Sequence, residues 1–309
     1  MEDYDVLILG SGAGGYSAAI YASRYNMSAA VIGKEPGGVA SEASEVENYP
    51  GFKKITGLEL MEKFRGHVQS LGSKVFIYSD IVSVKKHGNK FIARLEDGKE
   101  FSGKALIVAL GSKRRKLEIP GEKEFAGRGV SYCATCDAAF FKDRTVAIIG
   151  GNDSAAKAAL VLADIAKKVY IIYRKDKIRA EPVLADRIDS KGNIEYVYNA
   201  VPLRIQGVKV VKSVVIKQNG KERKIPLDGI FIEIGSTPED TLTAMLKLEK
   251  DVNGYIKVGQ DMSTSIPGVF AAGDVTTGSN MFRQLVTAVA EGAIAAESAY
   301  RYLSGKTSL

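Results

Sequence analysis

The chain has few of the side chains that bind metals or form structural disulfides. Its 309 residues include two cysteines, two histidines and no tryptophan. A structural zinc site needs about four cysteine or histidine ligands, so we expect no metal site of this kind. The two cysteines lie close together in the sequence, which favours a catalytic pair in a reducing cytosol over a structural bridge.

Long hydrophobic runs are also missing. The longest apolar stretches, such as residues 105–110, are far shorter than the roughly 20 residues that span a bilayer, and the acidic first residues do not predict a signal peptide. The net charge is +7, but the basic run at 113–116 has no interleaved aromatic residues and no nucleic-acid-binding motif. We therefore expect a cytoplasmic protein with neither a membrane nor a nucleic acid as its partner.

What the chain does contain is one Cys-x-x-Cys sequence, Cys133-Ala-Thr-Cys136. With no other thiol present, such a pair is suited to opening and closing one disulfide. Residues 136–141 are predicted to start a short helix, which would put Cys136 near an N-terminus that favours its thiolate. Asp137 is placed to carry a proton to and from a leaving thiolate. We predict Cys133, Cys136 and Asp137 as the catalytic residues.

Two segments of the chain repeat one pattern of strand, Gly-rich turn, Ala-rich helix and strand. The predicted elements are, in order, 5–9, 13–25 and 29–32 in the first segment and 145–149, 155–166 and 168–173 in the second. Each pattern is typical of the βαβ unit that opens a parallel, doubly wound sheet. The Cys-x-x-Cys sequence lies between the two Gly-rich turns.

The two repeats indicate two domains, one inserted into the other. Residues 74–101 alternate in short pieces separated by turns and predict an antiparallel meander. The strands 105–111 and 229–235 each precede a segment that crosses between domains, and residues 268–274 with a helix at 282–303 return to the first domain. We predict an α/β protein with two Rossmann-like doubly wound domains, one discontinuous (1–116 and 241–309) and one inserted (117–240).

The first Gly-rich turn predicts a dinucleotide site. Gly10, Gly12 and Gly15 form G-x-G-x-x-G directly after a strand and at the start of a helix. The first glycine allows the tight turn, the second lets the backbone approach a pyrophosphate, and the third allows close helix–sheet packing. The acid expected about 20 residues further on, at the ribose, is Glu35.

The second Gly-rich turn departs from this pattern. Gly150 and Ala155 fill the first and third roles, but Asn152 stands where the second glycine is expected, and its side chain would crowd a pyrophosphate. Arg174, Lys175 and Arg179 follow the second strand of the repeat, where basic groups suit an adenosine 2′-phosphate. A surface cluster of charge is the alternative interpretation of these three residues.

Taken together, these residues resemble the low-molecular-weight thioredoxin reductases over essentially the whole chain. The matching motifs are Gly10-Ser-Gly-Ala-Gly-Gly15, Glu45-Val-Glu-Asn-Tyr-Pro-Gly51, Cys133-Ala-Thr-Cys-Asp137, Arg179-Ala-Glu181, Gly268-Val-Phe-Ala-Ala-Gly-Asp274 and Arg283-Gln284. The resemblance implies FAD in the discontinuous domain, NADPH in the inserted domain, a homodimer, and a thioredoxin or thioredoxin-like partner. It also implies that Cys136 faces the flavin, that Cys133 attacks the partner, and that the domains rotate between these two tasks.

The resemblance also implies the residues that bind the cofactors. The expected FAD-binding residues are Gly10, Gly12, Ala13, Gly15, Lys34, Glu35, Gly37, Gly38, Asn48, Gly111, Gly273, Asp274, Arg283 and Gln284. The expected NADPH-binding residues are Gly150, Asn152, Asp153, Ser154, Arg174, Lys175 and Arg179. Tyr173-Arg174-Lys175 replaces the family's usual His-Arg-Arg, and Asn152 replaces a glycine; both departures concern the NADPH site rather than the FAD site.

Three alternatives remain open from the sequence. The same dithiol chemistry could draw electrons from a deazaflavin or ferredoxin, or could serve a peroxiredoxin or a glutaredoxin-like protein. A chain of another class could be a flavin-binding redox sensor that does not turn over. Larger disulfide reductases, which need a C-terminal histidine base, are excluded because no histidine follows His87.

Overall fold

The fold was analysed in a computed structural model, which describes residues 1–43 and 45–305. The chain divides into two compact units: unit 1 comprises Met1–Lys113 and Thr237–Leu309, and unit 2 comprises Arg114–Ser236. It passes between them at β7 (Ser112–Arg114) and again at β16 (Ser236–Pro238). Within the described residues, no helix has both the length and the apolar character needed to cross a membrane.

Unit 1 is built on a mixed sheet with the strand order β3-β2-β1-β6-β5-β4, in which β17 also pairs with β6. Strands β1, β2, β3, β6 and β17 run parallel, whereas β4 and β5 are antiparallel to their neighbours. The strands are β1 (Glu2–Leu9), β2 (Ala29–Ile32), β3 (Lys74–Phe76), β4 (Ile81–His87), β5 (Lys90–Leu95), β6 (Glu100–Val108) and β17 (Val269–Ala271). The helices are α1 (Ala13–Arg24), η1 (Gly38–Glu42), α2 (Gly57–Ser70), α6 (Thr241–Met245), η3 (Ser279–Met281) and α7 (Leu285–Leu303).

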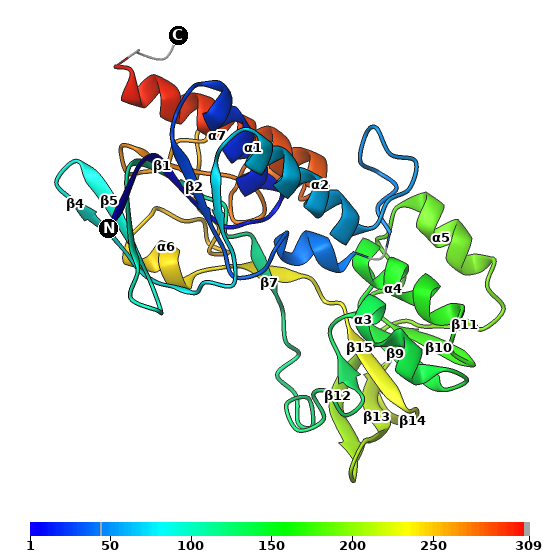
Figure 1. Cartoon of the computed structure of the whole chain (residues 1–309). Helices are drawn as coiled ribbons and strands as arrows, with labels where there is room; N and C mark the ends of the chain where they lie inside the picture. The colour runs from blue at the N-terminus through cyan, green and yellow to red at the C-terminus, as the bar shows by residue number, and fades with distance from the viewer. Residues whose placement is uncertain (44, 306–309) are drawn as a thin grey trace. The chain divides into compact units, whose positions relative to one another are not determined.

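Alternating side chains of the central strands of unit 1 pack into two cores. Val6 and Ile8 of β1 pack with α1, α2 and α7 on one face, whereas Leu7 and Leu9 pack with β4, β5 and α6 on the other. Helices α1 and α7 lie side by side (Figure 1). A Cβ on Gly292 would lie 2.2 Å from a backbone oxygen of α1, so small residues set this close approach.

Unit 2 is built on a parallel sheet with the strand order β11-β10-β9-β15-β8. Helices α3, α4 and α5 pack on one face, and the antiparallel sheet β12-β13-β14 packs on the other (Figure 1). The strands are β8 (Val130–Ser131), β9 (Thr145–Ile149), β10 (Lys168–Ile172), β11 (Ile194–Val197), β12 (Ala200–Gly207), β13 (Val211–Gln218), β14 (Lys221–Pro226) and β15 (Gly229–Ile232). The helices are α3 (Ala134–Asp137), η2 (Ala138–Phe141), α4 (Asp153–Ala163) and α5 (Pro182–Asp189).

The predicted class, an α/β fold with two doubly wound sheets, is confirmed, but several element boundaries differ. Residues 74–76 do not begin a meander, because β3 pairs in parallel with β2 at the sheet edge. Helix α7 begins at Leu285 rather than at 282, because Gln284 and Thr287 form a reciprocal capping box at its N-terminus. Helix α4 begins at Asp153 rather than at 155, because the Asn152 side chain caps it.

Candidate active site

The two cysteines form a disulfide at the start of α3 in unit 2. Their Cα atoms are 5.4 Å apart. Ser131, at the end of β8, accepts the N–H of Cys133 at 3.0 Å and so fixes the approach to the pair. Cys133 is half-buried and Cys136 is exposed.

The short helix begins earlier than the sequence predicts, and this changes which sulfur it favours. Cys133 is the N-cap of α3, and its Sγ accepts a hydrogen bond from the N–H of Cys136 at 3.2 Å. The sequence predicted instead that residues 136–141 form the first turn of the helix. Since an N–H donor stabilises a thiolate, the amide favours the Cys133 sulfur rather than the Cys136 sulfur.

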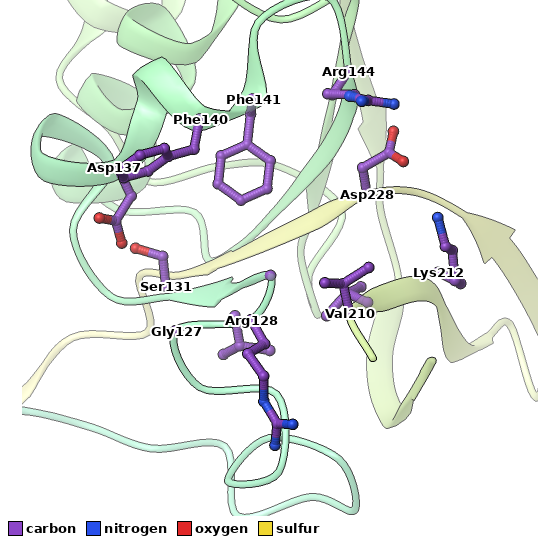
Figure 2. Close-up of a pocket in the computed structure, with 13 residues that line it drawn as sticks. Gly127, Arg128, Ser131, Asp137, Phe140, Phe141, Arg144, Val210, Lys212 and Asp228 are labelled. Carbon is purple, nitrogen blue, oxygen red and sulfur yellow. The ribbon is translucent and has the colours of Figure 1, made fainter. Parts of the chain in front are cut away.

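An open cavity of about 380 Å³ lies beside the redox pair within unit 2. Asp137, from α3, and Ser131, from β8, line it together with the aromatic rings of Phe140 and Phe141 (Figure 2). Its basic side chains are Arg128, Arg144 and Lys212. The Phe140 side chain is 80% exposed, which is unusual for so large an apolar group. Except for Asp137, sequence reasoning missed these residues, because they come from segments up to 84 positions apart.

The first Gly-rich turn, in unit 1, has the backbone that the motif predicts. Gly10 has a φ of +115°, and a Cβ there would lie 2.1 Å from the Ala109 oxygen. A Cβ on Gly15 would lie 2.0 Å from the Gly10 oxygen, so both positions exclude a side chain. Gly12 is the N-cap of α1 and makes no side-chain cap bond, and a Cβ on it would meet only one atom, at 3.8 Å. The open space at Gly12 and the free amides of α1 suit a pyrophosphate.

The loop after β2 contains four more of the predicted residues. Lys34 pairs with Asp80 at 2.9 Å, and the Glu35 carboxylate is exposed while its backbone oxygen accepts the Ser11 hydroxyl at 2.6 Å. Gly37 and Gly38 both have positive φ, and the Gly37 N–H donates to the Ser11 oxygen at 3.0 Å. These bonds hold the loop against the first Gly-rich turn.

Distant parts of unit 1 converge on the predicted cofactor residues. The Asn48 side chain donates to the Gln284 side chain at 3.1 Å across 236 positions of sequence. Burial raises the pKa of Asp274, and the hydrogen bond that its Oδ2 accepts from the Ser112 hydroxyl is long at 3.5 Å. Its oxygens therefore keep acceptor capacity for the hydroxyl groups of a ligand. The guanidinium of Arg283 lies 3.8 Å above the Tyr255 ring.

Glu291, a buried carboxylate in α7, is a further site residue that sequence reasoning missed. It is 4% exposed, and its Oε2 accepts the Gly273 N–H at 2.7 Å and lies 3.0 Å from the Thr276 hydroxyl. It therefore holds the turn that carries Asp274. The signal was present in the sequence: Glu291 has the helical spacing of Ala288 and Ala295, which belong to the face that packs in the core.

The second Gly-rich turn, in unit 2, is tied to the basic loop that follows β10. Gly150 has a φ of +150°, and a Cβ there would lie 2.2 Å from the Glu233 oxygen. The Arg179 N–H donates to the Gly151 oxygen at 2.6 Å, and Asp153 accepts the Glu181 N–H at 2.8 Å. The exposed cations of the loop are Arg174, Lys175, Lys177 and Arg179, and none of them has a salt bridge to another described residue.

Comparisons with known proteins agree with this arrangement. Residues 4–292 match the family described as pyridine nucleotide-disulphide oxidoreductase. A thioredoxin reductase of Treponema pallidum is 40% identical over 306 residues, which cover 97% of each chain. The solved thioredoxin reductase of Lactococcus lactis is 39% identical, with 98% of this chain and 99% of that chain covered and a TM-score of 0.94. For the solved thioredoxin reductase of T. acidophilum the identity is 39%, the coverage 97% and 98%, and the TM-score 0.91.

Proposed function

Since the chain belongs to the thioredoxin reductase family of pyridine nucleotide-disulphide oxidoreductases, we propose that Cys133 and Cys136 are the dithiol that reduces a thioredoxin-like protein. The protein is an FAD-dependent thioredoxin-disulfide reductase, and NADPH is the electron donor of its family. FAD, when bound, takes two electrons from NADPH and supplies them to a disulfide. The relatives favour this function over a non-catalytic sensor and over other donors or partners.

FAD fits the residues of unit 1. The Gly10, Gly12 and Gly15 turn would hold the pyrophosphate, and Asp274 would accept hydroxyl groups of the ribityl chain. Asn48 and Gln284, which contact each other, would lie against the same cofactor. The remaining residues proposed to hold FAD are Ala13, Lys34, Glu35, Gly37, Gly38, Gly111, Gly273 and Arg283.

NADPH would bind to unit 2 at the second Gly-rich turn. The first turn of α4 (Asp153 and Ser154) and the glycine Gly150 would lie at the pyrophosphate. The free cations Arg174 and Arg179, with Lys175 between them in sequence, would hold the 2′-phosphate that distinguishes NADPH from NADH. This division proposes unit 1 as the FAD-binding domain and unit 2 as the NADPH-binding domain.

The hydrogen bond from the Cys136 N–H to the Cys133 sulfur carries the proposal for the dithiol. Two electrons and two protons convert the disulfide into two thiols. The Cys133 thiolate, which that N–H stabilises, attacks one sulfur of the partner's disulfide and forms a mixed disulfide. The Cys136 thiolate then displaces the partner, which leaves as a dithiol, and the Cys133–Cys136 bond forms again. Asp137 carries protons to and from the thiols.

The cavity beside the pair is proposed as the surface that the partner contacts. The exposed Phe140 offers an apolar anchor. The cavity has three cations, Arg128, Arg144 and Lys212, against two acids, Asp137 and Asp228, and this small excess favours a partner that is acidic around its disulfide. We also propose a homodimer in the cytoplasm. The reducible cysteine pair supports the compartment, and light scattering of the purified protein tests the oligomeric state.

The test is turnover of the FAD-loaded protein with thioredoxin and either NADPH or NADH. We expect catalytic reduction of thioredoxin with a preference for NADPH, and the double variant Arg174→Ala, Arg179→Ala should lose that preference. One charge-assisted contact contributes about 1.5–3 kcal/mol, so each arginine should change the preference by roughly 10-fold or more. A protein that binds FAD but reduces only one equivalent of thioredoxin would instead be a sensor.

A further inference from the structure

The N-cap residues of the two Gly-rich turns have nearly the same backbone conformation but differ in side chain. Gly12, the N-cap of α1, has φ −86° and ψ −172°, and Asn152, the N-cap of α4, has φ −100° and ψ −175°. These are extended conformations that any residue adopts, so the backbone does not require glycine at either position. The difference between these two N-caps therefore lies in what the Asn152 side chain does.

The Asn152 side chain occupies a backbone amide that an anion would use. Its Oδ1 accepts the N–H of Ala155, the third residue of α4, at 3.0 Å. The first amides of a helix have no partner within the helix, and they donate hydrogen bonds to a phosphate that binds there. In α1 the corresponding amide belongs to Gly15, and Gly12 has no side chain that could accept it.

We propose that Asn152 sets the affinity for the nucleotide by competing with its pyrophosphate for the Ala155 amide. NADPH binding would then require the Asn152 side chain to release this amide and turn away. The inference rests on the proposed function, because it assigns the second Gly-rich turn to the nucleotide. The Asn152 side chain alone then limits the affinity for NADPH, because the backbone of the turn already has the conformation that binding needs.

The residues around the turn hold the basic loop next to it, independently of the Asn152 side chain. Tyr173 is 6% exposed, its ring lies within 2.7 Å of where a Gly151 Cβ would be, and its hydroxyl has no hydrogen-bond partner among the described residues. The Arg179 N–H holds the basic loop to the Gly151 oxygen. The free cations of the loop can therefore bind a 2′-phosphate while the Asn152 cap opposes the pyrophosphate. Binding should depend more on the 2′-phosphate than it would with an open turn.

The test measures equilibrium binding of NADP⁺ to the FAD-loaded protein by calorimetry, without turnover. Asn152→Gly removes the competing side chain, and we expect the dissociation constant to fall about 2-fold, the size of the difference between asparagine and glycine at an N-cap. The melting temperature should fall slightly, because α4 loses its cap. Asn152→Asp keeps the acceptor and adds a negative charge, so it should weaken NADP⁺ binding.

Two controls separate competition from general loosening. Thr56→Gly removes the equivalent cap of α2, where Thr56 accepts the Glu59 N–H at 3.2 Å, and should lower the melting temperature without changing NADP⁺ binding. Adenosine 2′-monophosphate lacks the pyrophosphate, so its affinity should be the same for wild type and Asn152→Gly.

Each other outcome overturns the inference. If Asn152→Gly binds NADP⁺ no more tightly than wild type, or tightens adenosine 2′-monophosphate equally, the side chain does not compete for the amide. If neither protein binds NADP⁺ at millimolar concentration, the NADPH assignment fails as well. If the protein reduced with dithionite still reduces thioredoxin, the proposed dithiol function stands even though the NADPH assignment fails.

Discussion

Replacing Glu291 should disturb FAD binding although Glu291 is not among the residues proposed to hold the cofactor. Its carboxylate is buried in α7 and accepts the Gly273 N–H, directly before Asp274. It also lies 3.0 Å from the Thr276 hydroxyl, so it holds both ends of this turn. Removing it frees the segment that presents Asp274.

The expected size of the effect follows from these two contacts. A hydrogen bond to a charged group contributes about 1.5–3 kcal/mol, so Glu291→Ala gives up about 3–6 kcal/mol of gross interaction. The variant no longer buries a carboxylate, and Thr276 keeps its bond to the Gly273 oxygen, so we expect a net loss of about 3 kcal/mol. Glu291→Gln keeps an acceptor for the Gly273 N–H but loses the charge, and should cost about half as much.

The assay is urea unfolding of the FAD-free protein together with a fluorescence titration of FAD. Glu297→Ala is the matched control, because Glu297 lies in the same helix and pairs with Arg301 at the surface, where such a pair contributes about 0.5 kcal/mol. We expect Glu291→Ala to lose the most stability, Glu291→Gln less, and Glu297→Ala the least. Glu291→Ala should also bind FAD at least 10-fold more weakly than wild type. If Glu291→Ala behaves like Glu297→Ala in both measurements, the reasoning is refuted.

Three further predictions concern the dithiol and the buried acid. Cys133→Ser and Cys136→Ser should each abolish thioredoxin reduction. Cys133→Ser should also give the long-wavelength charge-transfer absorption of a Cys136 thiolate beside oxidised FAD. If this band appears in Cys136→Ser instead, Cys133 is the residue that faces the flavin and Cys136 the one that attacks the partner. Asp137→Asn should slow turnover by about 10²-fold or more with FAD content unchanged, and an unchanged rate would leave Asp137 without a catalytic role. Because burial raises the pKa of Asp274 above 3.8, its contribution to stability is present at lower pH and lost as pH rises through the folded pKa. Asp274→Asn should therefore melt at a higher temperature than wild type near pH 7 when FAD is absent, with the difference vanishing below about pH 4; equal melting near pH 7 would contradict this.

Local patterns in the sequence were enough to predict the two βαβ units and the redox pair. Gly10 and Gly150 follow buried strands and need positive φ, which the G-x-G spacing encodes directly. Helix starts were predicted less well, because a start depends on which side chain caps the first turn. Asn152 was interpreted as an obstacle to a ligand, and its role as a cap could have been predicted from the ordinary preference for asparagine at such positions.

The parts of the site that depend on tertiary contacts could not be predicted from local patterns. The contact between Asn48 and Gln284 joins segments 236 positions apart, and no periodicity indicates it. The cavity beside the cysteines combines Arg128, Phe140 and Lys212 from separate elements. Glu291 was also missed, although a charged residue at the spacing of a buried apolar face is a recognisable signal of a buried hydrogen-bonded acid.

The difference between Gly12 and Asn152 corresponds to a difference in what the two units must do. An enzyme with FAD as a resident cofactor and NADPH as a substrate must retain the first and release the product of the second in every turnover. The first Gly-rich turn has no capping side chain at Gly12, so its amides stay available to FAD, which remains bound. Helix α1, which follows this turn, is packed closely on α7 at Gly292. A turn that caps itself competes with its ligand, which lowers affinity mainly by speeding release. Tighter NADP⁺ binding in Asn152→Gly would therefore slow product release, so the variant with the highest affinity need not have the highest turnover.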